Sequence, residues 1–284
     1  MNRHLLRVAA LAALPAAFLL LPASADGQDK EKPAAEITNS IGMKLRRIPA
    51  GSVNVRITAE DWLIAPVESY DIEVKQPIHL GAFEVTQAEY EAVMGKNPSA
   101  FAPRGDNRAR VKGLDTKRFP AENITWAEAN EFCAKLSAME KEKEAKRTYR
   151  LPTSDEWEYC ARAGSSVKVL FAFGDSLSSS DANFNGQVPY GEKAAKGKDL
   201  KRPTEVGSYK PNAWGLHDMH GNVWEWTSDP YRTKEGKPDG DRKLLRGGSW
   251  INRARDCAAS TRLVLAADQR YNNIGFRVVC EVGK

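Results

Sequence analysis

Two groups of side chains in this chain have types suited to metal or redox chemistry, and the first is its set of cysteines. The chain has four of them, at positions 133, 160, 257 and 280. Paired thiolates bind soft ions such as Cu(I), whereas in an oxidising compartment four cysteines can close two disulfides by any of three pairings. A lone reactive thiol at Cys257 is a further alternative, and the residues alone leave these uses open.

The second group lies in residues 216–226, where Asp218 and Glu225 flank a glycine-containing loop. Oxygen ligands on such a loop suit Ca²⁺. Glu225 can equally be a buried, hydrogen-bonded carboxylate between core tryptophans. His217 and His220 lie three residues apart, but because the chain has only four histidines we interpret both as solvated or packed, rather than as ligands of zinc or iron.

The composition describes an ordinary globular protein. The chain has 284 residues, of which 42% are hydrophobic and 28% charged, and its formal net charge is +5. These values exclude a wholly disordered, collagenous or multi-span membrane protein. No long basic run is present, so nucleic acid is not expected as a partner.

The N-terminus has the pattern of a secretory signal peptide. Arg3 and Arg7 precede an apolar stretch at 8–21, and Ala-Ser-Ala ends at Ala25. Residues 1–25 are therefore predicted to be removed on export to the periplasm or extracellular space, with no stable membrane insertion afterwards; an uncleaved anchor is the alternative. Residues 26–36 predict a flexible leader.

The rest of the chain, residues 37–284, is predicted to be one α+β domain. Capping boxes predict helices after Thr86, Thr125 and Thr153. Short strands are expected, such as 44–48 and 276–282, with much irregular loop between them. We interpret 191–203 as a surface loop and the charged run 140–147 as a solvated helix end.

Six separated segments carry a resemblance to a known family. They are Asn39-Ser-Ile-Gly-Met-Lys-Leu-Arg-Arg-Ile-Pro-Ala-Gly-Ser52, Phe83-Glu-Val-Thr-Gln-Ala-Glu-Tyr90, Arg150-Leu-Pro-Thr-Ser-Asp-Glu-Trp-Glu-Tyr159, the run 210–226 ending in Gly-Asn-Val-Trp-Glu-Trp, Leu245-Arg-Gly-Gly-Ser-Trp250 and Gly275-Phe-Arg277. In this order they resemble the formylglycine-generating enzyme (sulfatase-modifying factor) domain family over residues 37–282. The resemblance implies an irregular C-type-lectin-like fold with few helices and short antiparallel strands.

The resemblance implies an oxidase that converts a substrate cysteine to formylglycine with O₂ and a Cu(I) ion held by two thiolates. Here the segment that follows Gly-Gly-Ser-Trp is about five residues shorter than in active members and has one cysteine. Asn252 falls where the first catalytic cysteine would be, the second is deleted, and Cys257 matches a structural cysteine. A carboxamide does not bind Cu(I) as a thiolate does, so copper is not expected.

Two calcium sites and two disulfides are implied by the same resemblance. The first calcium site would use Asp218, Gly221, Val223 and Glu225, and the second would use Asn183, Phe184 and Asp199. The disulfides carried over are Cys133–Cys280 and Cys160–Cys257.

We therefore expect an exported, calcium-stabilised pseudoenzyme that binds a protein, peptide or glycan. Its ligand groove would be bordered by Trp214, Trp250 and Asn252, although core packing is the alternative for either tryptophan. The other hypothesis is an enzyme: a formylglycine-generating oxidase or a divergent oxygenase that uses other residues.

Overall fold

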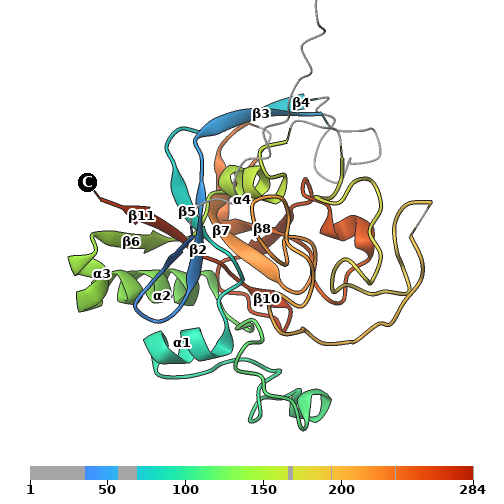
Figure 1. The fold of residues 1–284 in the computed structure, drawn as a ribbon, viewed down its shortest axis with the longest axis horizontal. Helices are drawn as coiled ribbons and strands as arrows, with labels where there is room; N and C mark the ends of the chain where they lie inside the picture. The colour runs from blue at the N-terminus through green and yellow to red at the C-terminus, as the bar shows by residue number, and fades with distance from the viewer. Residues whose placement is uncertain (1–35, 57–68, 166–168, 193, 234, 284) are drawn as a thin grey trace, which may run out of the picture. The chain divides into compact units, whose positions relative to one another are not determined.

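The computed structural model describes residues 36–56, 69–165, 169–192, 194–233 and 235–283 (Figure 1). The predicted signal peptide and all but the last residue of the predicted leader lie outside these ranges. That last residue, Glu36, begins the first strand. Among the described residues, no helix has the length and apolar character needed to cross a bilayer.

A five-stranded sheet joins the two ends of the described chain. Its order is β1 (Glu36–Thr38), β2 (Lys44–Ile48), β5 (Ile78–Gly81), β11 (Val279–Val282) and β6 (Arg147–Arg150), and all neighbouring strands are antiparallel. The strand predicted at 276–282 starts only at Val279. Phe276 and Val278 are buried before it, and the side chain of Arg277 leaves the sheet to pair elsewhere.

A four-stranded sheet carries the tryptophan-rich segment. Its order is β10 (Ile274–Gly275), β7 (Trp224–Arg232), β8 (Pro238–Arg246) and β9 (Leu263–Ala266), with β10 parallel to β7 and the other pairs antiparallel. A separate antiparallel hairpin is formed by β3 (Gly51–Arg56) and β4 (Ser69–Val74). The fold is thus mixed α+β with short, mostly antiparallel strands, as predicted.

Three α-helices begin at the predicted capping boxes. They are α1 (Gln87–Met94), α2 (Trp126–Ala138) and α4 (Ser154–Ala161), and in each the N-cap threonine and the glutamate three residues later satisfy each other's backbone amides. Short helical turns also occur at α3 (Glu140–Glu144), η1 (Arg108–Val111) and η2 (Ala254–Cys257).

The interpretation of 140–147 as only a solvated helix end is wrong. Glu142 of α3 is fully buried and accepts hydrogen bonds from the Ser40 amide at 2.7 Å and the Tyr149 hydroxyl at 2.6 Å. These bonds tie the helix to β6 and to the loop between β1 and β2, so one carboxylate of a charged run has a structural role. Residues 191–192 and 194–203 form no helix or strand, in keeping with the predicted loop.

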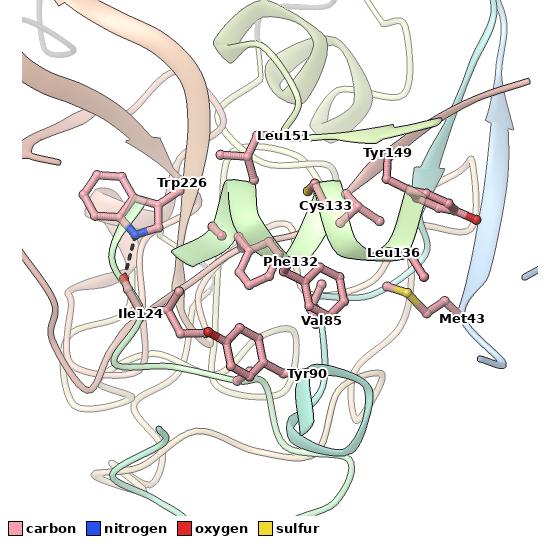
Figure 2. Close-up of a cluster of buried hydrophobic side chains, with 14 of the residues drawn as sticks. Met43, Val85, Tyr90, Ile124, Phe132, Cys133, Leu136, Tyr149, Leu151 and Trp226 are labelled. Atoms are coloured by element: carbon pink, nitrogen blue, oxygen red, sulfur yellow. Dashed lines mark hydrogen bonds between the residues drawn. The ribbon is translucent and has the colours of Figure 1, made fainter. Parts of the chain in front are cut away.

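The largest apolar cluster lies around α2, whose inward face packs on β6 and on the aromatic rings of neighbouring elements (Figure 2). Phe132 stacks on Tyr90 and meets Phe276 edge-on. Trp226 donates from its indole nitrogen to the Ile124 carbonyl at 2.9 Å. Trp226 lies in β7 of the four-stranded sheet, and Cys280 of the same cluster lies in β11 of the five-stranded sheet. The two larger sheets therefore share one core.

The outer edge of β6 is covered by a side chain of α2. The Ser137 hydroxyl accepts a hydrogen bond from the Tyr149 amide at 2.8 Å and donates to the Cys133 carbonyl at 2.8 Å. Tyr149 lies opposite Cys280 of β11, and its amide points away from that neighbour toward α2. An edge amide of the five-stranded sheet is therefore satisfied within the chain.

Candidate functional site

Charged side chains from the family-like segments lie at the centre of the domain and not on its surface. Five of the six segments, all but 39–52, each contribute one acid or one arginine that is at most 1% exposed: Glu84, Glu158, Glu225, Arg246 and Arg277. Buried charges are stable only when they are paired and hydrogen-bonded. These five residues therefore define the site by the pairs that they make.

The first pair joins Glu225 of β7 to Arg277. The guanidinium binds the carboxylate with Nε at 2.6 Å and Nη2 at 2.7 Å, and the Trp157 indole donates to Oε2 at 2.8 Å. The remaining guanidinium hydrogens reach the carbonyls of Gly81 and His217. Burial works against the charge of Arg277, but the Glu225 carboxylate outweighs it and raises the pKa of Arg277.

Two more carboxyl groups lie in the field of this pair. Glu84 accepts from the Asn222 side chain at 2.6 Å and from the Val223 amide at 3.0 Å. Asp218 accepts from the Gly207 amide at 2.7 Å. Burial, followed by the charges of Asp218 and Glu225, raises the pKa of Glu84 well above its usual range, and burial raises the pKa of Asp218 to about 6.

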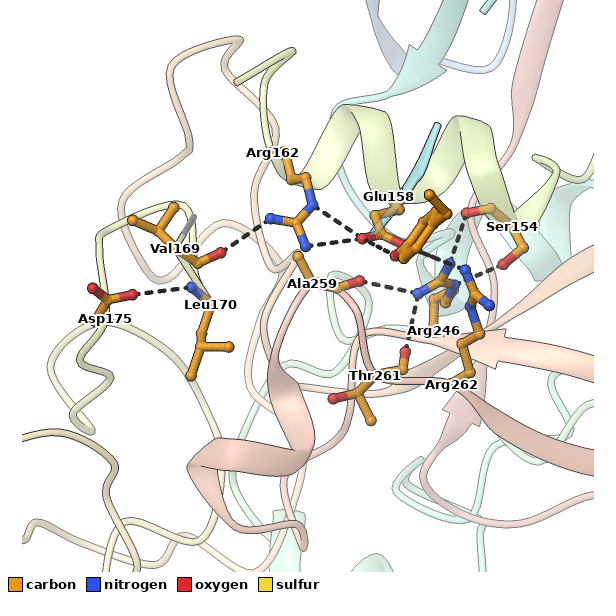
Figure 3. Close-up of polar contacts among 11 residues, drawn as sticks. Ser154, Glu158, Arg162, Val169, Leu170, Asp175, Arg246, Ala259, Thr261 and Arg262 are labelled. Atoms are coloured by element: carbon orange, nitrogen blue, oxygen red, sulfur yellow. Dashed lines mark hydrogen bonds and ion pairs between the residues drawn. The ribbon is translucent and has the colours of Figure 1, made fainter. Parts of the chain in front are cut away.

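The second pair joins Glu158 of α4 to Arg246 of β8, with 2.8 Å between Oε2 and Nη2 (Figure 3). Arg162 and Arg262 add further positive charge, and the Tyr70 hydroxyl donates to the same carboxylate. Burial would raise the pKa of Glu158, but the neighbouring arginines lower it below its usual value. Since Tyr70 lies in β4, this network fastens the β3–β4 hairpin to α4.

At the first predicted calcium set, the carboxylate already has a cationic partner. Both oxygens of Glu225 are bound by Arg277, so a guanidinium occupies the position of the counter-cation. Gly221 connects its loop to the Gly247 segment, because its amide donates to the Gly247 carbonyl at 2.7 Å. Its φ of 102° lies in the left-handed region, which glycine adopts without strain. Val223 is fully buried. The alternative, a buried and hydrogen-bonded Glu225, describes this geometry.

The two segments that contain the second predicted calcium set are hydrogen-bonded to each other. The segment after Asn183 and Phe184 lies beside the segment that contains Asp199, because the Gly197 amide donates to the Gly186 carbonyl at 2.7 Å. The Asn183 amide nitrogen donates to the Arg202 carbonyl at 3.0 Å, and Asp199 accepts from the Lys201 amide. A carboxamide, a carbonyl and a carboxylate are oxygen donors of the kind that Ca²⁺ prefers.

Both histidines of the 216–226 segment are packed. His220 Nε2 accepts from the Ala172 amide at 2.9 Å, so Nδ1 carries the proton and donates to the Cys257 carbonyl at 2.9 Å. Burial lowers the pKa of His220 to about 4. His217 donates from Nδ1 to the Tyr209 carbonyl and stacks on Phe83. Each neutral ring therefore connects its own loop to other segments: His220 to Ala172 and Cys257, and His217 to Tyr209.

Asn252, at the position expected for a catalytic thiolate, is a hydrogen-bond acceptor. Its carboxamide oxygen receives the Trp224 indole N–H at 2.9 Å and the Ser249 hydroxyl at 2.6 Å. Asn273 donates to the same hydroxyl at 3.0 Å. The position is therefore part of a network of neutral side chains that has no sulfur atom.

Neither expected disulfide is present, because all four cysteines are buried free thiols. Cys133 and Cys280 share the cluster around α2, but Cys160 and Cys257 belong to two different apolar clusters. Cys257 also lies behind Gly248, where a Cβ atom would meet its sulfur. Burial raises the pKa of all four thiols, to about 12 for Cys133 and about 11 for Cys280. No paired thiolate site for Cu(I) is formed.

The two tryptophans predicted to border a groove are each 8% exposed and lie in separate clusters. Trp214 meets Tyr159 edge-on, and Trp250 meets Phe101 edge-on. Both rings pack in the core, which is the alternative given above. Of the three predicted groove residues, Asn252 is the only one that is partly exposed.

These positions can now be compared with those of known proteins. A family model described as "Sulfatase-modifying factor enzyme 1-like domain" matches residues 32–282. The chain belongs to this family. Residues of the sulfatase-modifying factor domain thus make up nearly all of the described structure, and the family-like segments coincide with the buried charge pairs.

Relatives of this sulfatase-modifying factor chain carry several names. The Inactive C-alpha-formylglycine-generating enzyme 2 of Bos taurus is 34% identical over 173 residues, which are 58% of this chain and 52% of that protein. Chaperone protein LppX of Paenibacillus barcinonensis is 28% identical over 71% of this chain and 79% of its own length. The Formylglycine-generating enzyme of Streptomyces coelicolor is 36% identical over 45% of each chain. The chain thus spans about half the length of the first of these relatives.

Solved structures support the fold. PvdO from Pseudomonas aeruginosa has a TM-score of 0.67 at 25% identity, covering 89% of this chain and 100% of that one. Treponema denticola variable protein 1 has a TM-score of 0.63 at 24% identity, covering 87% and 99%.

Residue patterns alone missed Glu84, Glu158 and Arg246 as partners at the centre of the domain. A signal was present for Arg246, which is the single charge in the Leu245–Trp250 segment, whereas Glu84 and Glu158 share their segments with other charged residues. The sequence does not predict which acid pairs with which arginine. The partners are far apart in the chain, by 88 residues for Glu158 and Arg246 and by 52 residues for Glu225 and Arg277.

Proposed function

We propose that this chain is an exported sulfatase-modifying factor domain that binds a protein, peptide or glycan ligand and has no formylglycine-generating activity. The observation that carries the proposal is Asn252, whose carboxamide oxygen is committed to Trp224 and Ser249. Cu(I) oxidase chemistry requires soft sulfur ligands. The similarity to proteins named inactive formylglycine-generating enzymes is consistent with this reading.

The pattern of burial supports a binding role as well. The ionisable groups at the centre, such as Glu225 and Arg277, are saturated by each other and fully buried. They hold loops together and have no exposed face for a substrate. A domain whose charged centre is structural and whose long loops are exposed has the arrangement expected of a binding module.

The test is a comparison with an active relative. The purified protein is incubated with copper, O₂ and a cysteine-containing peptide, and aldehyde formation is followed by mass spectrometry of the peptide, with the Streptomyces coelicolor formylglycine-generating enzyme as the positive control. We expect no aldehyde from this chain. Copper-dependent aldehyde formation would overturn the proposal and favour the oxidase.

We also propose one structural calcium ion, held by Asn183, Phe184 and Asp199. The proposal is supported by the contact between their two segments and by the oxygen donors that they offer. It includes no ion at Glu225, where Arg277 already pairs with the carboxylate.

A further inference from the structure

Two loops, residues 104–118 and 196–205, concentrate positive charge, and we call them together the basic surface. The first loop has six basic and two acidic residues, and the second has four basic and two acidic residues. The combined excess of six positive charges is larger than the net charge of the whole chain, which is +5. The rest of the chain is therefore close to neutral, and its positive field is local.

The two loops are in contact, so their charges act on one region. The Val206 amide donates to the Arg118 carbonyl at 2.9 Å, and Arg118 pairs with Glu205 at 2.8 Å. The Arg202 guanidinium lies 5.6 Å from the centre of the Phe119 ring. These contacts join the C-terminal end of the first loop, at residues 118–119, to the C-terminal end of the second, at residues 202–206.

Most of the cations on the basic surface are exposed and unpaired. Within the described part of the chain, no acid forms an ion pair with five of them: Arg104, Arg108, Arg110, Lys112 and Lys117. Figure 1 shows the short helix η1 projecting past α1, away from the sheets. Its two arginines, Arg108 and Arg110, are both exposed.

The loop that carries η1 has a fixed base. Val111 is buried with Phe101, Phe119 and Trp250 in one apolar cluster. The Thr116 hydroxyl donates to the Gln87 side chain of α1 at 3.0 Å. A surface anchored in this way loses little conformational entropy when it binds a ligand.

The chemistry of the region favours a sugar chain over a nucleic acid. Neither loop contains a phenylalanine, tyrosine or tryptophan, whereas single-stranded nucleic acids are bound on aromatic stacking platforms. A groove beside the loop is lined by the polar groups of Asn97, Ser99, Asn123 and Arg104, and also by two carboxylates, Glu91 and Asp106, so the positive charge lies on the loops and not in the groove. Amides and hydroxyls hydrogen-bond sugar hydroxyls, and guanidinium groups bind sulfate and carboxylate through paired N–H donors.

We propose that the basic surface binds a sulfated or carboxylated polysaccharide chain. This inference rests on the proposed binding function and assigns it a ligand class. It places that ligand on the 104–118 and 196–205 loops.

The test uses heparin as the probe and measures its affinity for the full chain over a series of salt concentrations. The double variant R108E/R110E is compared with K75E/K237E, which makes the same change in net charge at two exposed lysines in other loops. We expect R108E/R110E to lose about tenfold or more in affinity and to reduce the salt slope by about two. K75E/K237E is expected to stay close to the unchanged protein, and equal melting temperatures would show that both variants fold.

An equal loss in both double variants would overturn the inference, because net charge alone would then account for binding. Tighter binding of oligo(dT) than of heparin would overturn it in favour of a nucleic acid, and tighter binding of a poly-glutamate peptide would overturn it in favour of an acidic protein. Absence of heparin binding by the unchanged protein would also overturn it. The aldehyde assay described above tests the proposed function separately, so the two failures are distinguishable.

Discussion

Asn252 is the single residue on which the catalytic and non-catalytic interpretations differ most, and its contacts predict what its removal costs. In N252A, the Trp224 indole and the Ser249 hydroxyl lose their acceptor, and we expect a loss of about 1–3 kcal/mol in the free energy of unfolding. N252D keeps the acceptor oxygen and is expected to lose less. Urea denaturation of the three proteins measures this, and equal losses in both variants would contradict the acceptor role.

Glu122 is a buried carboxyl with an oxygen that has no partner among the described residues. Burial raises its pKa to about 8, against the backbone amides of Phe101 and Ala100, which lower it. Because the folded state holds this proton more tightly than the unfolded state, the stability contributed by the neutral form falls as pH rises from about 4.5 to about 8. Below that window the two states are equally protonated.

The corresponding measurement compares E122Q with the unchanged protein between pH 5 and pH 9. We expect the difference in free energy of unfolding to move in favour of E122Q with rising pH, by at most about 1.4 kcal/mol per pH unit. A difference that stays constant over this range would show that Glu122 is ionised throughout.

At the scale of secondary-structure elements, the Glu225–Arg277 pair connects β7 to the segment that precedes β11. In R277M, the Glu225 carboxylate stays buried near Glu84 and Asp218 without its cation. Loss of one partner of a buried pair costs about 3–5 kcal/mol. Because E225Q in the same chain removes the orphaned charge, R277M/E225Q is expected to be less destabilised than the sum of the single variants. Additive losses in chemical denaturation would contradict direct coupling.

Elements whose signal is local in sequence were predictable, and elements that depend on distant partners were not. The helices after Thr86, Thr125 and Thr153 begin where predicted, because a capping box needs only four consecutive residues. The strand expected from residue 276 begins at Val279 because Arg277 turns toward a carboxylate that lies 52 residues away in the chain. A charge pair of this kind has no local pattern.

The candidate site was predictable only in part, for the same reason. The position of Asn252 follows from the segment around it, but its partners Trp224 and Ser249 were not predicted. The structure holds all four thiols free, and of the two predicted pairs only Cys133 and Cys280 share a cluster, since a pairing carried over with shifted offsets does not specify which cluster each thiol enters. Trp214 and Trp250 were misplaced because the sequence cannot distinguish a buried indole from one at a groove.

At the scale of the whole molecule, the thiols report on global unfolding. All four are free and buried, so we expect negligible alkylation of the native protein and four alkylated cysteines per chain in denaturant without reductant. Intact-protein mass spectrometry gives the count directly. Two or fewer modified cysteines in denaturant would contradict the structure and would indicate that at least one disulfide is present.

Calcium is also a question about the stability of the whole domain. An ion that binds only the folded state raises the melting temperature, and the increase grows with the logarithm of the free ion concentration above the dissociation constant. We expect EDTA to lower the melting temperature, calcium to restore it, and D199N to remove the response. E225Q is the matched control in which the calcium response should persist, and a response lost in E225Q but kept in D199N would place the ion elsewhere.

The contact between Ser137 and the Tyr149 amide has a consequence for how copies of this domain behave at high concentration. A sheet edge with free amides is a template on which another polypeptide can add a strand and begin a fibril. Here one hydroxyl from a helix already occupies that amide. At this position β6 offers no free amide to an added strand, and the two arginines of the strand, Arg147 and Arg150, add the charge that also disfavours edge-to-edge pairing.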